Sequence, residues 1–170
     1  LTLDMSAAGA ATFNGTLTTA AKGIATASLP AGSVLQVIHA THSTAAQTGN
    51  TSYADTGLTA SITPSASSSK VLVIVGQPLN VQTTTNANRT FTFNIVRAST
   101  EIVAGTVNQE MNTTDSMKTS TGNFLNKLDS PNTTDAVAYK TQMKVSAGSA
   151  DIFAQANSTA STITLMEIAG

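Results

Sequence analysis

The two histidines are the residues of this chain that come closest to a metal-binding motif. His39 and His42 lie three positions apart, and in a strand this spacing points their side chains to opposite faces. A zinc site needs three or four converging ligands, and the nearest carboxylate in the sequence is Asp55. The spacing favours two unconnected polar residues, one at a strand end and one in a loop. The alternative is a ring of His39 side chains from symmetry-related copies that shares a metal.

The nine carboxylates of the chain do not form a recognisable catalytic pair. A glycosidase needs two carboxylates at a fixed separation in a cleft; here they occur singly, although the sequence leaves a pairing in space open. The chain has no Cys and no Trp, no Gly-x-Ser-x-Gly nucleophile motif and no glycine-rich phosphate loop. We therefore expect no enzymatic activity, no cofactor and no metal site. A glycan-processing enzyme is the alternative that these features argue against.

Charge and hydropathy exclude two further classes of protein. Eight Lys and Arg residues against nine Asp and Glu residues give a formal net charge of −1, and the cations are not clustered. This pattern predicts no nucleic-acid binding, which depends on clustered basic residues. The apolar runs are far shorter than the roughly 20 residues of a membrane-spanning helix, so we expect no membrane insertion. Charged residues make up only 10% of the chain, and hydroxyl and amide side chains are expected to solvate the surface.

The pattern of apolar residues predicts an all-β fold. The run Lys70–Gly76 is apolar, rich in β-branched residues and followed by Gln77 and Pro78, which indicates a central strand buried on both faces and ending there. The Phe-rich stretch 89–97 alternates strictly and should form a hairpin with 101–105 through a turn at Ala98 and Ser99. Other strands are predicted at 33–40, 58–63, about 122–127, 137–145, 151–156 and 162–168. About eight or nine evenly spaced strands without a helical window predict an antiparallel β-sandwich or jelly roll.

The first 30 residues differ from the rest and predict a separate stem. Short alternating pieces split by Gly, within residues 1–30, are too small to form a core alone. They could lie on the following domain, wind together with identical copies, or form a mobile leader. We predict a stem or linker segment at 1–30 and a β-sandwich head domain at 31–170. Because the chain begins with Leu1 rather than Met, we also expect a longer protein with an upstream attachment part.

The closing strand predicts self-association. It carries apolar residues on both faces, although a strand at the chain terminus should lie at a sheet edge, so a symmetric partner is expected to bury it. We expect a homotrimer. The predicted trimer interface comprises Ile163, Leu165, Met166 and Ile168. Glu167, between them, is expected to be paired at that interface, with Lys70 or Arg97 as its partner.

Several segments resemble a family of bacteriophage fibre-tip domains found in phages of marine bacteria and cyanobacteria. The resemblance is carried by Ser33–Val37, Asp55–Ser65, Ser68–Val73, Phe91–Ile102 and Thr162–Gly170. The opening residues 1–13 resemble the repetitive strand segments of fibre stems. The resemblance implies a homotrimeric virion protein with a β-sandwich head, located in a tail fibre or on the capsid surface. Its implied partners are other virion proteins, through the upstream part, and a host surface glycan or protein.

Within this resemblance, binding is expected in loops at the free end, away from the stem. Asn- and Thr-rich loops suit weak recognition of polar groups and suit solubility equally well. The two candidate loops are Thr84 to Arg89 and Asn112 to Lys118. Their candidate binding residues are Thr84, Asn86, Asn88, Arg89, Asn112, Asp115 and Lys118. If these loops bind no receptor, the chain would be a capsid head fibre or decoration protein instead.

Overall fold

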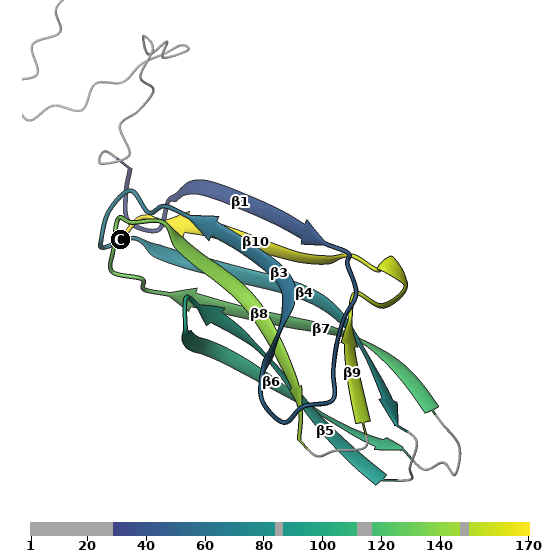
Figure 1. The fold of residues 1–170 in the computed structure, drawn as a ribbon. Helices are drawn as coiled ribbons and strands as arrows, with labels where there is room; N and C mark the ends of the chain where they lie inside the picture. Colours follow the sequence, from purple (N-terminus) through teal and green to yellow (C-terminus); the bar gives the residue numbers. More distant parts are fainter. Residues whose placement is uncertain (1–28, 84–86, 112–116, 147–149) are drawn as a thin grey trace, which may run out of the picture.

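The computed structural model describes residues 29–83, 87–111, 117–146 and 150–170, which form two antiparallel β-sheets packed face to face (Figure 1). This part of the chain contains ten strands, a 3-10 turn at Ala156–Ser158 and no α-helix. No helix among these residues is long and apolar enough to cross a membrane. The predicted antiparallel β-sandwich is therefore confirmed. The predicted head domain at 31–170 contains all ten strands, whereas most of the predicted stem at 1–30 lies outside the described residues.

Strand β4 organises the larger sheet. Sheet A contains β1 (Val34–His42), β2 (Ala46–Thr48), β4 (Lys70–Thr83), β7 (Met117–Asp129), β9 (Ala150–Ala154) and β10 (Ser161–Ile168). Strand β7 pairs with the whole length of β4 on one edge. On the other edge β10 pairs with residues 70–76 and β9 with residues 79–83, and β1 and β2 lie beyond them. Sheet B contains β3 (Ala54–Ile62), β8 (Val137–Val145), β5 (Ala87–Arg97) and β6 (Thr100–Met111), in that order.

The central strand is longer than predicted and buried on one face only. It continues through Pro78, which lies opposite the connection between β9 and β10, where that edge of the sheet is interrupted. A missing N–H donor disturbs the sheet least at such a break. Val73 and its inward neighbours are buried, whereas Leu72 is half-buried and Ile74 is 38% exposed on the outer face. The prediction of burial on both faces was wrong because an apolar run does not reveal which residues lie under the second sheet.

The closing strand β10 does not lie at an edge. It is paired on both sides, with β1 and with β4, because β1 forms the edge of sheet A. Ile163 and Leu165 are 0% exposed within a single chain, so the sandwich itself buries them. Met166 and Ile168 are half-buried on the outer face of sheet A. The reason for placing Ile163 and Leu165 at a trimer interface is therefore wrong, while the trimer itself stays a prediction.

The core fills the space between the sheets as two adjoining clusters. Phe91, Phe93 and Ile95 from β5 point inward, as the alternation predicts. The first cluster contains Leu58, Ala60, Ile62, Val71, Val73, Val75, Ile95, Val137, Tyr139, Ile163 and Leu165. The second contains Leu79, Val81, Phe91, Phe93, Met143, Val145, Ala150, Ile152 and Ala154. Each large side chain buried this way contributes roughly 1.5–3 kcal/mol, which explains why few aromatic residues suffice.

The two ends of the sandwich differ in what they carry. At the proximal end the chain enters through Gly32, whose N–H donates to the carbonyl of Ala169 near the C-terminus. At the distal end the strand ends at Thr83, Met117 and Ala150 lie side by side, since Thr83 pairs with both of the other two. Lys70, at the other end of β4, pairs with Ile168 near the proximal end, so the length of β4 separates the two ends (Figure 1).

Candidate contact surface

Three of the predicted binding residues, Asn88, Arg89 and Lys118, are described by the structure and lie on strands at the distal end. Asn88 and Arg89 lie on β5, where their backbones pair with Glu110 and Gln109, so the predicted loop Thr84 to Arg89 was too long. Strand β4 pairs with β7 as far as Thr83, and β5 pairs with β6 from Ala87 onward. Lys118 lies on β7. The other predicted binding residues, Thr84, Asn86, Asn112 and Asp115, lie outside the described residues.

Lys118 lies over an aromatic ring on the outer face of sheet A. Its ammonium nitrogen is 4.5 Å from the centroid of the Phe153 ring. The two residues come from strands on opposite edges of β4: Lys118 pairs with Gln82, and Phe153 pairs with Asn80. Asp151 also pairs with Gln82, so a carboxylate shares this outward row with the ammonium. We name Lys118, Phe153 and Asp151, with Asn80 and Gln82 between them, the distal platform.

The distal platform combines three kinds of interaction group. The ammonium of Lys118 donates hydrogen bonds, the carboxylate of Asp151 accepts them, and the half-buried ring of Phe153 offers an apolar surface. A cation–π contact at an exposed site contributes about 0.5–1 kcal/mol. The contact with the Phe153 ring therefore restricts the Lys118 side chain, while its charge stays in contact with solvent. This set of groups can bind a surface that carries hydroxyl and carboxylate groups. It contains no arrangement that activates a nucleophile.

A second lysine–aromatic pair lies on the outer face of sheet B. The ammonium of Lys144 is 4.4 Å from the centroid of the Tyr53 ring. Burial, the negative charge of Glu101 and a hydrogen bond with that carboxylate raise the pKa of the Tyr53 hydroxyl. Asn94 donates to Glu101 over 2.7 Å. The phenol therefore stays neutral, and this cluster anchors the segment before β3 to the sheet.

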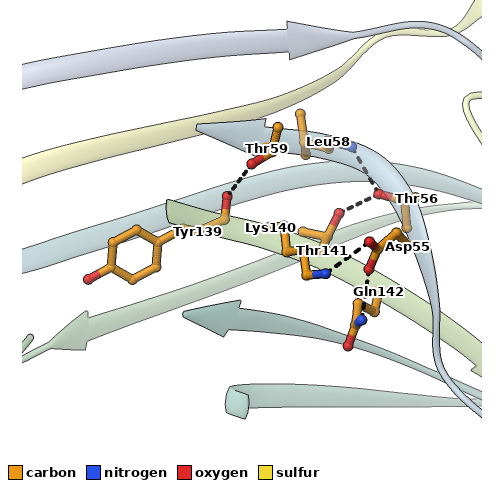
Figure 2. A network of polar contacts seen from close by, with 8 residues as sticks. All are labelled: Asp55, Thr56, Leu58, Thr59, Tyr139, Lys140, Thr141 and Gln142. Atoms are coloured by element: carbon orange, nitrogen blue, oxygen red, sulfur yellow. Dashed lines mark hydrogen bonds and ion pairs between the residues drawn. The ribbon is translucent and has the colours of Figure 1, made fainter. Parts of the chain in front are cut away.

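Strands β3 and β8 are joined by a polar network on and beneath the outer face of sheet B (Figure 2). Lys140 donates to Asp55 over 2.9 Å and Gln142 donates to the same carboxylate over 2.7 Å. These hydrogen bonds lower the pKa of Asp55. Beneath them, the hydroxyls of Thr56 and Thr141 are hydrogen-bonded in a buried position. The network contains one carboxylate, that of Asp55, which is already ion-paired with Lys140. It therefore joins β3 to β8 and supplies no second carboxylate for acid–base catalysis.

The histidines lie on opposite faces, as predicted, but His42 is the last residue of β1 and not a loop residue, because the strand runs two residues further than expected. His39 points outward from sheet A, and its Nδ1 is 3.0 Å from the hydroxyl of Thr164. His42 points inward against Gly57, whose positive φ of 88° and missing side chain leave room for the ring. The described residues contain no group of three His, Cys, Asp or Glu side chains that could hold a metal ion. A shared ring of His39 from several copies stays a prediction.

Glu167 is buried without a cationic partner, contrary to the prediction. It is 1% exposed and accepts hydrogen bonds from Gln36 over 2.6 Å and from the amide and hydroxyl of Ser65, each over 2.7 Å. Burial alone would raise the pKa of Glu167, but these hydrogen bonds together hold it below its ordinary value. Arg97, one predicted partner, instead pairs with Asp129 over 2.8 Å. The carboxylate fastens the segment before β4 to β1 and β10 within one chain.

Comparison with known proteins identifies no family. No family model matches the sequence, and no curated protein matches it. Among solved structures, the chain is similar to the VP2 subviral particle of infectious bursal disease virus, with a TM-score of 0.35 and 13% sequence identity. The match covers 79% of this chain, and the chain spans 37% of that protein. A likeness this weak carries no argument about function.

Sequence reasoning missed the aromatic partners of the two lysines. Lys118 and Phe153 are far apart in the chain and meet only because β7 and β9 pair with the same strand. The signal for Phe153 is present in the alternation of residues 151–156, which places it on the face opposite to Ile152. No local signal links Tyr53 to Lys144, because Tyr53 precedes its strand and the contact depends on the pairing of β3 with β8.

Proposed function

We propose that this chain is a structural protein of a bacteriophage particle: the homotrimeric tip of a tail fibre, whose distal end contacts a glycan or protein of the host surface. The resemblance of the sequence to fibre-tip domains motivates the class. The all-β sandwich is compatible with it. Other virion proteins are proposed as partners through the part of the protein upstream of the head.

The observation that carries the proposal is the separation of the two ends. The chain enters and leaves the sandwich at the proximal end, where Gly32 bonds to Ala169. The ends of β4, β7 and β9, at Thr83, Met117 and Ala150, lie together at the opposite end (Figure 1). A domain tethered at one end presents the other to its surroundings, and loops held by a rigid scaffold commonly carry binding residues. Lys118 on the distal platform is the predicted binding residue whose side chain the structure places there.

The chemistry of the distal platform implies weak individual contacts. Neutral hydrogen bonds contribute about 1 kcal/mol each and those to charged groups about 1.5–3 kcal/mol. One platform with a single ammonium and a single ring therefore supports low affinity. Attachment of a particle then depends on several platforms that engage together, since linked sites raise the overall affinity by factors of about 10² to 10⁴.

Adsorption of phage particles to host cells tests the proposal. We expect Lys118→Ala combined with Phe153→Ala to reduce the adsorption rate at least tenfold, with a further reduction when Asn86, Asn88 and Arg89 are also replaced by Ala. The matched control is Lys70→Ala, which removes an exposed lysine at the proximal end and should leave adsorption unchanged. Native mass spectrometry should report the same oligomer for every variant.

The competing role is a capsid head fibre or decoration protein without a receptor. If adsorption is unaffected by changes in both distal segments and in the platform, the receptor role belongs to another protein and the decoration role replaces it. Locating the chain in an intact particle by electron microscopy, on the tail or on the capsid, distinguishes the two directly.

A further inference from the structure

One row of apolar side chains crosses the whole outer face of sheet A. The register pairs Val37 of β1 with Met166 of β10, Met166 with Leu72 of β4, and Leu72 with Leu128 of β7. All four side chains point away from the sandwich core, because their neighbours along each strand point into it. Val37 is 54% exposed and Leu128 is 49% exposed. The row is continuous over four strands. In a single chain it is not covered by any other element of the described fold.

The rest of this face extends the apolar surface. Val34, Ile74 and Phe124 lie on it, and Phe124 is 79% exposed beside a hollow of about 280 Å³ lined partly by Gly76 and Gly122. Together with Val37 and Leu128 these are the large apolar side chains that stand exposed among the described residues. All of them belong to one face. We name this surface, between β1 and β7, the apolar face.

The size of the apolar face fits an interface between two proteins. Four strands spaced about 4.8 Å apart, with about eight residues each at 3.4 Å, cover roughly 500 Å². This area includes polar outward residues such as His39, Thr164 and Asn126, so its apolar part is smaller; the largest apolar patches on monomers measure about 300–600 Å² and are often functional. Two such faces in contact bury roughly 1,000 Å² in total, which is the lower limit for a specific protein–protein interface. The face therefore supports association of moderate strength.

The charges on and around the apolar face favour a second copy of the chain over a charged partner. The outward positions of its four strands carry no carboxylate, since Glu167 and Asp129 both point inward. The charged and titratable groups are Lys70 at the proximal margin, Lys118 at the distal end and His39 on β1. A face with so little charge attracts no charged partner over distance. Copies of the chain can therefore pack against it around a shared axis without burying an unpaired carboxylate.

The edges of sheet A and the course of the chain favour the same occupant. On the edge strand β7, Lys118 and Lys127 protect against further pairing, whereas β1 carries no lysine, proline or carboxylate. The described part of the chain begins at Leu29, five residues before Val34 at the corner of the apolar face. A stem of several copies at residues 1–30, as the sequence predicts, would bring these corners into proximity.

We infer that the apolar face, centred on Val37, Leu72, Leu128 and Met166, is the surface through which copies of this chain associate. This inference deepens the proposed homotrimer, on which it rests for the number of copies. It moves the predicted interface from Ile163 and Leu165, which the core buries, to the outward residues of the same strand and its neighbours.

Sedimentation equilibrium of the full chain tests the inference with matched variants. Val37→Lys and Leu128→Lys each place a charge on the apolar face, while Ser61→Lys places one at an exposed position on the outer face of sheet B. We expect each face variant to raise the dissociation constant of the oligomer at least tenfold and the control to change it less than twofold. Unfolding midpoints measured at concentrations where every variant is monomeric should agree, which separates lost association from lost folding.

Because the chain has no Cys, the labelling rate of a single introduced thiol measures the solvent exposure of that one position. In the assembled protein Val37→Cys should react with a maleimide at least tenfold more slowly than Ser61→Cys. Dilution below the dissociation constant should make the two rates equal. An equal rate in the assembled protein would overturn the inference.

The outcomes separate this inference from the proposed function. A wild-type trimer that the face variants leave intact overturns the apolar face as the interface and leaves the fibre tip standing. A dimer that the face variants dissociate supports the interface and overturns the trimer. A monomer at all concentrations overturns both. A stable complex of wild-type monomer with a different protein, abolished by Leu128→Lys, assigns the face to that partner and overturns self-association.

Discussion

The two outer faces of the sandwich are built on the same strand alternation but carry opposite chemistry. On sheet B the outward positions hold Asp55, Lys140 and Gln142 in a hydrogen-bonded network, and hydroxyls such as Thr92. On sheet A the corresponding positions hold the apolar row through Leu72. Both inner faces are equally apolar. The difference shows that the outer face of sheet B is polar throughout this network, whereas the outer face of sheet A carries a continuous apolar row from β1 to β7 and its charged groups lie mainly at the distal end.

The largest effect is expected from a test that separates the two faces of sheet A itself. Leu165 and Met166 are neighbours on β10; the first is 0% exposed in the core and the second lies on the apolar face. Leu165→Lys buries an unpaired charge and should destabilise the fold by about 4 kcal/mol or more. Met166→Lys should cost less than about 1 kcal/mol in the monomer, as surface changes do. Denaturant titration of both variants measures the difference, and equal losses would mean that the faces are wrongly assigned.

The second test removes a polar bridge between the two sheets, formed by Asp129 of sheet A with Tyr139 and Arg97 of sheet B. Asp129 on β7 accepts hydrogen bonds from Tyr139 and Arg97, each over 2.8 Å. Asp129→Ala leaves both donors without their acceptor in a largely buried position and should cost about 2–3 kcal/mol. Tyr139→Phe removes one hydrogen bond and should cost about 1 kcal/mol. A loss for Asp129→Ala no larger than for Tyr139→Phe would contradict the role of the bridge.

The fold class and most strands could be predicted from local patterns. The alternation of Phe91, Phe93 and Ile95 and that of Leu58, Ala60 and Ile62 each identify the inward face of a strand. Such patterns arise from the two-residue period of a strand facing one core, and they need no knowledge of the partner strand. This is why the class of fold was accessible although no helix or motif marked it.

Strand order and the chemistry of the outer faces could not be predicted in the same way. The run containing Leu72 and Ile74 is apolar at every position, so alternation gives no signal about which side is covered. Met166 and Leu165 look alike in sequence for the same reason. The predicted partner of Glu167 was wrong because its donors, Gln36 and Ser65, lie on distant segments that only the sheet pairing brings together.

The third test concerns a carboxylate that the fold keeps off the apolar face. Glu167 points inward from β10, and its pKa is held below the ordinary value by hydrogen bonds despite its burial. A lowered pKa in the folded state contributes stability above the unfolded pKa of about 4.3, and this contribution is lost as the pH falls through the folded value.

Glu167→Gln should therefore be less stable than the wild type by about 1–2 kcal/mol at pH 7, because a neutral amide accepts the hydrogen bonds from Ser65 and Gln36 less strongly. The deficit should shrink as the pH falls below the unfolded pKa of about 4.3 and through the lower pKa of the folded carboxylate. Thermal unfolding between pH 3 and pH 7 measures it. A deficit that is constant over this range would show that the charge of Glu167 contributes nothing.

The smallest effect is expected on the outer face of sheet B, and its size is itself informative. The ion pair of Asp55 with Lys140 joins β3 to β8 at 2.9 Å, but the Asp55 side chain is 55% exposed. An exposed pair of this kind contributes about 0.2–1 kcal/mol, and salt screens it over about 10 Å at 0.1 M ionic strength. Asp55→Asn should therefore lower the free energy of unfolding by about 0.5 kcal/mol at low salt and by less in 1 M NaCl, with no change in oligomeric state.

Substitution on the apolar face should show the reverse, a change in oligomeric state with little change in monomer stability. If Asp55→Asn also dissociated the oligomer, both outer faces would belong to interfaces and the contrast between them would fail.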